Sequence, residues 1–419
     1  EALGFTEVAA ETEADIIFVN TCSVRDTAEQ KARSYLGRLI KLKMKNEKLK
    51  IMLVGCMAER LKGEAKSRYP QIDLLLGPND IVTLPDQLSS LFTNYEPGFT
   101  HGLLPITNNA SFPVKRTPSP SAYIPIIRGC NSHCTYCIVP SVRGHEVSRS
   151  KKIILKEISD LDKNIFKEVI LLGQNVANYN DNGFHLQDLL YEVAKLPGIL
   201  RIRFLTSHPK DTTIELIEAV KNNPKVCATF HLPLQSGDDD ILKAMNRGHT
   251  LADYRKLINN IRSRIPDAAI TTDLIVGFPG ETEEQFQNTL NAVQEFDFDL
   301  ANTAVYSPRP GTAAAKKADD TLPKIKKARL AILNKLVADI ANKKNQLLIG
   351  QTVEVLVENS GIGRTRGNKI IQFPGSQDMV GQLVQVKIDT AQSFILRGKP
   401  GAQRAQLFKL NKNDIIMRK

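Results

Sequence analysis

The chain has 419 residues, 42% of them hydrophobic, and its 56 lysines and arginines outnumber its 45 acidic residues, giving a formal net charge of +11. This length and apolar content predict two or three domains, each with its own core. No apolar run approaches the length of a membrane-spanning helix and the start does not resemble a signal peptide, so we expect a cytoplasmic protein without membrane contact. Six cysteines are too few and too irregularly spaced for a disulfide framework, which also indicates a reducing compartment.

Two strand-like runs near the start of the chain are each followed by a cysteine. Residues 16–19 precede Cys22, residues 51–54 precede Cys56, and a helix is predicted after each cysteine. The ends of neighbouring parallel strands meet at one edge of a sheet, so the two thiols could lie together. Taken alone, either cysteine is better interpreted as a buried structural thiol.

Composition and patterning divide the chain into four stretches. Residues 1–96 predict a βα domain with a parallel sheet. The chain begins at Glu1 without an initiator Met, and we expect this domain to lack its first residues. Residues 97–121 are rich in Pro, Ser and Asn and predict a linker. Residues 122–349 alternate between strands and helices, and residues 350–419 change to short strands.

The central stretch predicts a partial barrel. Six strand–helix units in a row indicate a parallel sheet, here an incomplete (βα)6 barrel, so the fold class is α/β. The predicted strands are residues 124–127, 168–172, 202–205, 229–234, 269–276 and 300–306, and helices are predicted at 153–163, 186–195, 213–222 and 254–265.

Polar clusters follow these strands, at the end where parallel α/β folds bind ligands. A lone polar residue there is more often a cap or a turn, but positions around one barrel mouth favour cofactor binding. The candidates are Gln174, Asn175, Ser207, Gln235 and Asp273. No hydrolytic triad surrounds His208 or His231, which we interpret as structural, and no side chain is identified as catalytic.

Three cysteines follow the first strand of the barrel in the spacing C-x3-C-x2-C. Cys130, Cys134 and Cys137 place three soft thiolates on one loop, a density that suits zinc or an iron–sulfur cluster. A structural zinc would need a fourth ligand, which His133 or His145 could supply. A cluster with three ligands would leave one iron open, and the position in the barrel mouth favours such a reactive site.

The last stretch predicts a small antiparallel barrel. Val353, Val355 and Val357 recur at every second position, with Gly and Pro between the runs. From residue 350 to 419 there are 11 lysines and arginines against 5 acidic residues, a surplus that favours phosphate backbones, although a solvated basic surface explains it equally well.

Several motifs together resemble the radical-SAM superfamily and, within it, the methylthiotransferases. The sequence is most similar to the tRNA 2-methylthio-N6-isopentenyladenosine synthases. The matching segments are residues 20–25, 55–60, 128–140, 143–149, 232–237 and 272–282. The resemblance implies methylthiolation of C2 of N6-isopentenyladenosine next to the anticodon of tRNA, and it implies an RNA-binding TRAM domain at residues 350–419.

The resemblance also implies the cofactors and partners. Cys130, Cys134 and Cys137 would hold a [4Fe–4S] cluster that binds S-adenosylmethionine, while Cys22 and Cys56 would help to hold an auxiliary [4Fe–4S] cluster. The family's third auxiliary cysteine lies upstream of Cys22, where this chain has none. Expected partners are tRNA with an isopentenylated anticodon arm, an electron donor such as flavodoxin or ferredoxin, and an iron–sulfur carrier. We expect a monomer.

Three alternatives stay open at this point. A sister enzyme methylthiolates threonylcarbamoyladenosine in tRNA, although Asn131 and residues 138–140 favour the isopentenyl type. Another sister modifies an aspartate of a ribosomal protein, but the residues around Cys130 fit it poorly. A non-catalytic zinc or iron–sulfur RNA-binding protein would explain the cysteines and the basic tail. It would not explain six strand-end motifs around one mouth. Cys227 matches no family ligand and is interpreted as a core thiol.

Overall fold

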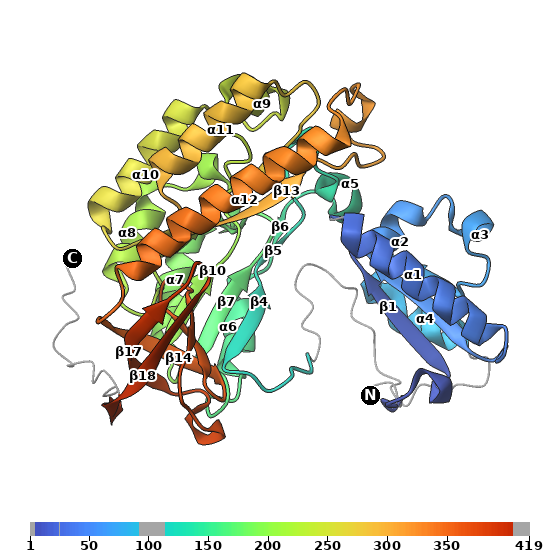
Figure 1. Ribbon diagram of the computed structural model, residues 1–419. Coiled ribbons are helices and arrows are strands. Elements are labelled where there is room, and N and C mark those ends of the chain that lie inside the picture. Colours follow the sequence, from blue (N-terminus) through green and yellow to red (C-terminus); the bar gives the residue numbers. More distant parts are fainter. Residues whose placement is uncertain (1–4, 25, 92–113, 405–419) are drawn as a thin grey trace.

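The computed structural model describes residues 5–24, 26–91 and 114–404 (Figure 1). The basic tail, the chain start and most of the predicted linker at 97–121 lie outside the described residues. Along the chain the structure contains a small α/β unit, a large central α/β unit and a β-barrel.

The first unit is built on a parallel sheet of strand order β1-β2-β3. Leu36 and Leu39 of helix α1 pack with Ile51 and Leu53 of β2 in a core that is separate from that of the central unit. The predicted sheet is confirmed, with the short β3 as an addition. The elements are β1 (Ile16–Thr21), α1 (Asp26–Lys43), β2 (Lys50–Gly55), α2 (Cys56–Leu61), α3 (Ala65–Arg68), β3 (Leu74–Leu76) and α4 (Leu84–Leu91).

The central unit contains six parallel strands that follow one another in chain order. They form two three-stranded sheets, β4-β7-β10 and β11-β12-β13, linked by a single bridge between Ile202 and Val226. The predicted α/β class is therefore confirmed. The strands are β4 (Ser121–Pro125), β7 (Glu168–Leu172), β10 (Arg201–Phe204), β11 (Thr229–His231), β12 (Ala269–Val276) and β13 (Leu300–Val305).

Helices cover the outer face of these strands (Figure 1). Leu189 and Leu190 of α7 belong to one large core with Val169, Leu171 and Ile202 of the strands. The helices are α6 (Lys151–Ser159), α7 (Leu186–Lys195), α8 (Ile214–Asn222), α9 (Asp239–Ala244), α10 (Leu251–Arg264), α11 (Glu283–Phe296) and α12 (Pro323–Gln346). Short elements in the loops are β5 (Ile127–Arg128), α5 (Val139–Arg143), β6 (Val147–Ser148), β8 (Asn180–Asp181) and β9 (Phe184–His185).

The last unit is a closed barrel with strand order β14-β15-β16-β18-β17. Four of its pairings are antiparallel, but β16 and β18 run parallel, so the prediction of an antiparallel barrel is wrong at this pair. An odd number of strands cannot close a ring with alternating directions, and five strands force one parallel pair. The strands are β14 (Thr352–Asn359), β15 (Ile362–Thr365), β16 (Ile370–Gln372), β17 (Leu383–Ala391) and β18 (Ile395–Arg404).

The barrel docks against the amino-terminal ends of the central strands. Arg201 starts β10, is fully buried, and pairs with Glu354 of β14 at 2.7 Å between Nη2 and Oε1. Arg203 donates to the carbonyl oxygens of Thr365 (3.2 Å), the last residue of β15, and of Arg366 (2.9 Å), which follows it. The barrel therefore lies at one end of the central strands, and the loops after the strands occupy the other end.

Among the residues described, no helix combines the length and the apolar character that crossing a membrane requires.

Candidate active site

The three cysteines of the C-x3-C-x2-C motif lie on the loop between β5 and α5. Cys134 is buried, while Cys130 and Cys137 are partly buried. Burial, with smaller contributions from the nearby thiols of Cys134 and Cys130, raises the pKa of Cys137 to about 11. Burial likewise raises the pKa of Cys130, with a further contribution from Cys134. The three thiols are therefore close enough to influence one another.

The donor set of this loop fits an iron–sulfur cluster better than a structural zinc. His133 and His145, the alternative zinc ligands, are both exposed, and the ring of His145 contacts Asn131 at 3.4 Å. Among the described residues, no three His, Cys, Asp or Glu side chains, the three cysteines included, are grouped so that they could hold a metal ion. The chemical type of the donors, three soft thiolates on one loop, is the set that leaves one iron of a cluster open.

Three of the five predicted cofactor residues have buried oxygen atoms without a protein partner. These atoms are Oε1 of Gln174, Oγ of Ser207 and Oε1 of Gln235. A buried polar atom without a hydrogen bond is costly, and native proteins keep such atoms mainly where a ligand, water or function accounts for them. The three residues follow β7, β10 and β11, so their unpartnered atoms mark the carboxyl ends of neighbouring strands.

The other two predicted cofactor residues have protein partners. The amide of Asn175 donates to Asp211 at 2.6 Å and accepts from the backbone N–H of His208 at 2.9 Å. The carboxylate of Asp273 accepts from Asn302 at 3.0 Å and lies 3.3 Å from Nε2 of His231. Asn175 therefore joins the loops after β7 and β10.

Two of these strand ends also contain a residue with a strained backbone. Thr206 and Gln235 have φ values of 71° and 75°, a region that residues other than glycine seldom adopt. Gln235 is held there by backbone hydrogen bonds to Asp273 (2.9 Å) and Ile275 (2.9 Å) of β12. Strained residues fixed by surrounding structure are commonly found at functional sites.

The structure adds a residue that the sequence did not single out. Arg247 is 4% exposed and donates to Sγ of Cys134 at 3.2 Å and to the carbonyl oxygen of Pro233 at 2.7 Å. Nothing in the local sequence marks this arginine, because its contact with Cys134 spans 113 positions.

Two histidines beside Arg247 are held neutral. Burial lowers the pKa of His208 to about 2, with a further contribution from Arg247. Burial and Arg247 likewise lower the pKa of His249 to about 4. The two rings meet edge to face with their centroids 5.6 Å apart. His208 also accepts from the backbone of Lys210, which agrees with its interpretation as structural.

The register of the first sheet brings Cys22 and Cys56 to the same edge. Thr21 and Gly55 are paired partners at the ends of β1 and β2, and a cysteine follows each of them. Cys56 is buried, and its Sγ accepts a hydrogen bond from Nε of Arg143 at 3.3 Å.

The same edge faces the central unit. Arg143 ends α5, the helix that follows the cysteine loop and lies between the two units (Figure 1). Arg309, which follows β13, pairs with Asp26 at 3.2 Å and donates to the carbonyl oxygen of Val24 at 3.2 Å. The two groups of cysteines thus lie on facing sides of one domain boundary. Cys227 is fully buried and belongs to neither group.

Three family models match the chain in succession. "Uncharacterized protein family UPF0004" matches residues 1–77, "Radical SAM superfamily" matches residues 124–293, and "TRAM domain" matches residues 346–400. Together these domains fit the methylthiotransferase family. The radical-SAM match includes the cysteine loop and the ends of β7, β10 and β11.

Solved structures support the same fold. One is the radical S-adenosylmethionine methyltransferase TsrM from Kitasatospora setae with cobalamin and a [4Fe-4S] cluster bound, which is 13% identical with a TM-score of 0.55. That alignment covers 72% of this chain and 65% of TsrM. Another is the cobalamin-dependent S-adenosylmethionine radical enzyme OxsB, 14% identical with a TM-score of 0.50, covering 80% of this chain and 48% of OxsB. The chain thus spans less than two thirds of either structure.

Proposed function

We propose that the chain is a radical-SAM tRNA methylthiotransferase that modifies C2 of N6-isopentenyladenosine next to the anticodon. The observation that carries this proposal is the cysteine loop after the first strands of the central unit, together with the buried oxygen atoms without protein partners that follow three other strands of that unit. The methylthiotransferase domain order supports it, and so does the [4Fe-4S] cluster that is named for TsrM, a protein of similar fold.

The cofactor chemistry follows from the substrate. C2 of adenine is an unactivated aromatic carbon, beyond the reach of ordinary acid–base side chains, so a cofactor has to supply the reactivity. A [4Fe–4S] cluster on Cys130, Cys134 and Cys137 would supply one electron for the reductive cleavage of bound S-adenosylmethionine. Gln174, Ser207 and Gln235 would bind polar groups of the cofactor, because each has a buried oxygen atom without a protein partner and the three residues follow β7, β10 and β11.

The first unit would hold the sulfur for the reaction. Cys22 and Cys56 share one sheet edge and would supply two thiolates of an auxiliary cluster, whose third ligand is expected upstream in the family pattern. The contact between Arg143 and Cys56 would keep this edge beside the cysteine loop.

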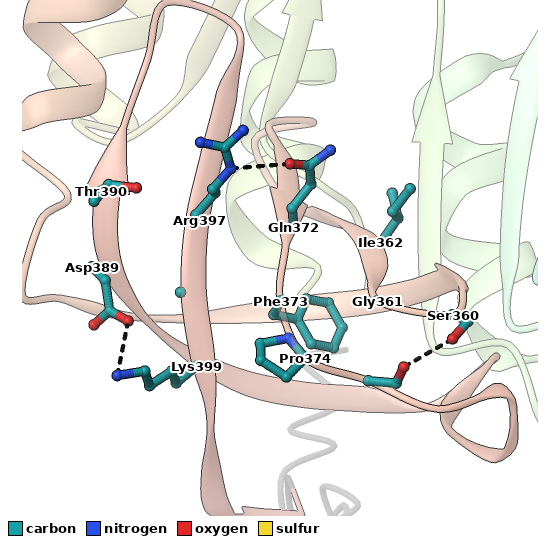
Figure 2. Close-up of a pocket in the computed structure, with 12 residues that line it drawn as sticks. Ser360, Gly361, Ile362, Gln372, Phe373, Pro374, Asp389, Thr390, Arg397 and Lys399 are labelled. Carbon is teal, nitrogen blue, oxygen red and sulfur yellow. Dashed lines mark hydrogen bonds and ion pairs between the residues drawn. The ribbon is translucent and has the colours of Figure 1, made fainter.

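The C-terminal barrel would bind the tRNA backbone. Figure 2 shows a pocket on the barrel that is lined by Phe373 and by the exposed cations Arg397 and Lys399, with Nζ of Lys399 3.8 Å from the carboxylate of Asp389. Exposed cations at such a pocket suit phosphate oxygens.

The test uses the reconstituted protein and three tRNA substrates that carry isopentenyladenosine, threonylcarbamoyladenosine or unmodified adenosine. Nucleoside mass spectrometry should detect the methylthio product with the isopentenyl substrate and far less with the other two. A pocket that binds the apolar isopentenyl group should bind the threonylcarbamoyl group poorly, because its carboxylate would be buried without a partner. Higher turnover of the threonylcarbamoyl substrate would contradict the assignment.

A double variant, Cys22→Ala with Cys56→Ala, serves to separate the two cysteine groups. It should still form 5′-deoxyadenosine but no methylthio product, because radical generation and sulfur supply would use different cysteines. An unchanged product yield would show that these two cysteines are structural.

A further inference from the structure

Arg247 is a buried cation whose protein partners leave its charge uncompensated. Its guanidinium donates to the carbonyl oxygen of Pro233 at 2.7 Å, to Sγ of Cys134 at 3.2 Å and to the hydroxyl of Tyr136 at 3.4 Å. Its Nε is buried and lacks a hydrogen-bond partner. No Asp or Glu among the described residues forms an ion pair with it, in contrast to the buried Arg201 and Arg203 at the other end of the strands.

Burying an unpaired charge in a protein costs several kcal/mol, so buried charges are normally matched by an opposite charge. A neutral Cys134 thiol would not provide one. A thiolate that ligates an iron–sulfur cluster would, because the cluster with its three cysteine ligands carries a net negative charge. The position of Arg247 is therefore explained once Cys134 is a cluster ligand.

The chain around Arg247 also fixes the backbone of the cysteine loop. Ala244 and Met245, at the end of α9, accept hydrogen bonds from Oγ1 and the backbone N–H of Thr135, both at 2.9 Å. The side chain of Asn246 donates to the carbonyl oxygen of His133 at 2.9 Å.

With Arg247, four consecutive residues from 244 to 247 bind the central part of the loop. The guanidinium is thereby held in register with Cys134, and side chains fixed in this way tune a metal centre without ligating it.

We propose that Arg247 is a positioning residue for the cluster, which stabilises the added negative charge of the reduced state through its N–H···S hydrogen bond to Cys134. This inference rests on the proposed function, because it takes Cys134 as a cluster ligand. Hydrogen bonds to the sulfur atoms and nearby charge are two of the factors that set the reduction potential of such clusters. Arg247 therefore raises the potential of this cluster and makes its reduction easier.

The experiment measures the midpoint potential of the reconstituted protein by EPR-monitored titration, without S-adenosylmethionine or tRNA. To keep the signal to one cluster, every variant is made in the Cys22→Ala, Cys56→Ala background. Arg247→Met should shift the potential to a more negative value, and Arg247→Lys should retain most of the parent value. Arg262→Met is the matched control, because Arg262 also donates to backbone carbonyl groups, those of Phe296 and Asp297, and should leave the potential unchanged.

The outcomes separate this inference from the proposed function. A parent protein that takes up no iron would refute the cluster itself, whereas a loaded parent and an unshifted Arg247→Met variant would refute only the role of Arg247. If Arg247→Met takes up no iron while Arg247→Lys does and keeps its potential, the requirement for a positive charge is supported. Loss of iron from both variants would overturn the inference, because iron uptake would then depend on the shape of the arginine side chain and not on its positive charge.

Discussion

Buried polar groups at the two ends of the central strands differ in whether they have protein partners. At the amino end, Arg203 pairs with Glu168 at 3.2 Å and donates to Oγ1 of Thr229 at 3.1 Å, and the C-terminal barrel covers them. At the carboxyl end, Ser207 and Gln235 have buried atoms without partners.

This difference separates structural from chemical roles within one unit. Polar groups that pair with each other stabilise the fold, and polar groups that are left unpaired are available to a ligand. In parallel α/β barrels the end after the strands carries the active site, and the unpaired atoms of Gln174, Ser207 and Gln235 lie at that end. Substitutions of paired groups at the amino end should therefore lower the stability, and substitutions of unpaired groups at the carboxyl end should weaken ligand binding.

The largest effect is expected at the amino end. Replacing Arg203 with Met would leave Glu168 buried without its cation. It would also remove the hydrogen bonds that Arg203 donates to the carbonyl oxygens of Thr365 and Arg366. Breaking a buried pair in this way costs about 3–5 kcal/mol, which thermal unfolding of the cluster-free protein would measure. Adding Glu168→Gln should recover part of the loss. A loss below about 1 kcal/mol would mean that the docking contributes little stability.

The buried histidines should make the carboxyl end sensitive to acid. The pKa values of His208 and His249 are lowered by burial to about 2 and about 4, whereas an unfolded histidine titrates near 6.5. The unfolded chain binds more protons below pH 6.5, so the free energy of unfolding falls as the pH drops from about 6.5 toward 4. Each histidine contributes up to about 1.4 kcal/mol per pH unit.

His208→Asn tests this pH dependence, because it removes one of the two titrating groups. In denaturant unfolding between pH 4 and pH 8, the free energy of unfolding should fall less steeply below pH 6.5 in this variant than in the parent protein. An equally steep fall would contradict the lowered pKa of His208.

Binding of tRNA should depend on exposed cations of the barrel. The structure argues against deleting residues 350–419 as a test, because the deletion would uncover Arg201 and Arg203. Arg397→Gln with Lys399→Gln should instead lower the affinity and flatten its salt dependence by roughly one counterion for each lost phosphate contact.

A matched control for this pair removes two exposed cations from the helices of the central unit, by Lys156→Gln with Lys195→Gln. Equal salt slopes for the barrel variant and the control would assign the effect to overall charge.

The smallest effect is expected for Ser207→Ala. Its hydroxyl has no protein partner, so removal should leave the stability nearly unchanged. Loss of one hydrogen bond should nevertheless weaken S-adenosylmethionine binding by up to about tenfold, measured by calorimetry. Ser236→Ala is the control, because that buried hydroxyl accepts from the backbone N–H of Asp238 at 3.3 Å. The control should lose stability and keep its affinity. The reverse pattern would contradict the assignment of Ser207.

Hydrophobic periodicity predicted the strands of the central unit well. Residues 168–172 and 269–276 are strands, and residues 186–195 are a helix, with the bounds that the sequence predicted. These segments bury regular apolar positions, a local signal. The three-residue strand β3 was missed because so short a run carries little periodicity.

The sequence could not predict how the barrel docks. Arg201 and Arg203 alternate with apolar residues along β10, a pattern that normally indicates an exposed face. Both are buried, because the barrel supplies the carboxylate of Glu354 and four backbone carbonyl groups from more than 150 positions away. Arg247 was missed for the same reason, since its partner Cys134 is distant in sequence.

The central claim is that the carboxyl end of the strands performs radical-SAM chemistry, and one measurement tests it most directly. The parent protein and a variant with Cys130, Cys134 and Cys137 all replaced by Ala would be reconstituted anaerobically with iron and sulfide. Each would then be given S-adenosylmethionine and a reductant. The account predicts 5′-deoxyadenosine from the parent protein and none from the variant, which should keep its fold. Equal amounts of the nucleoside from both proteins, or bound zinc without iron in the parent, would contradict it.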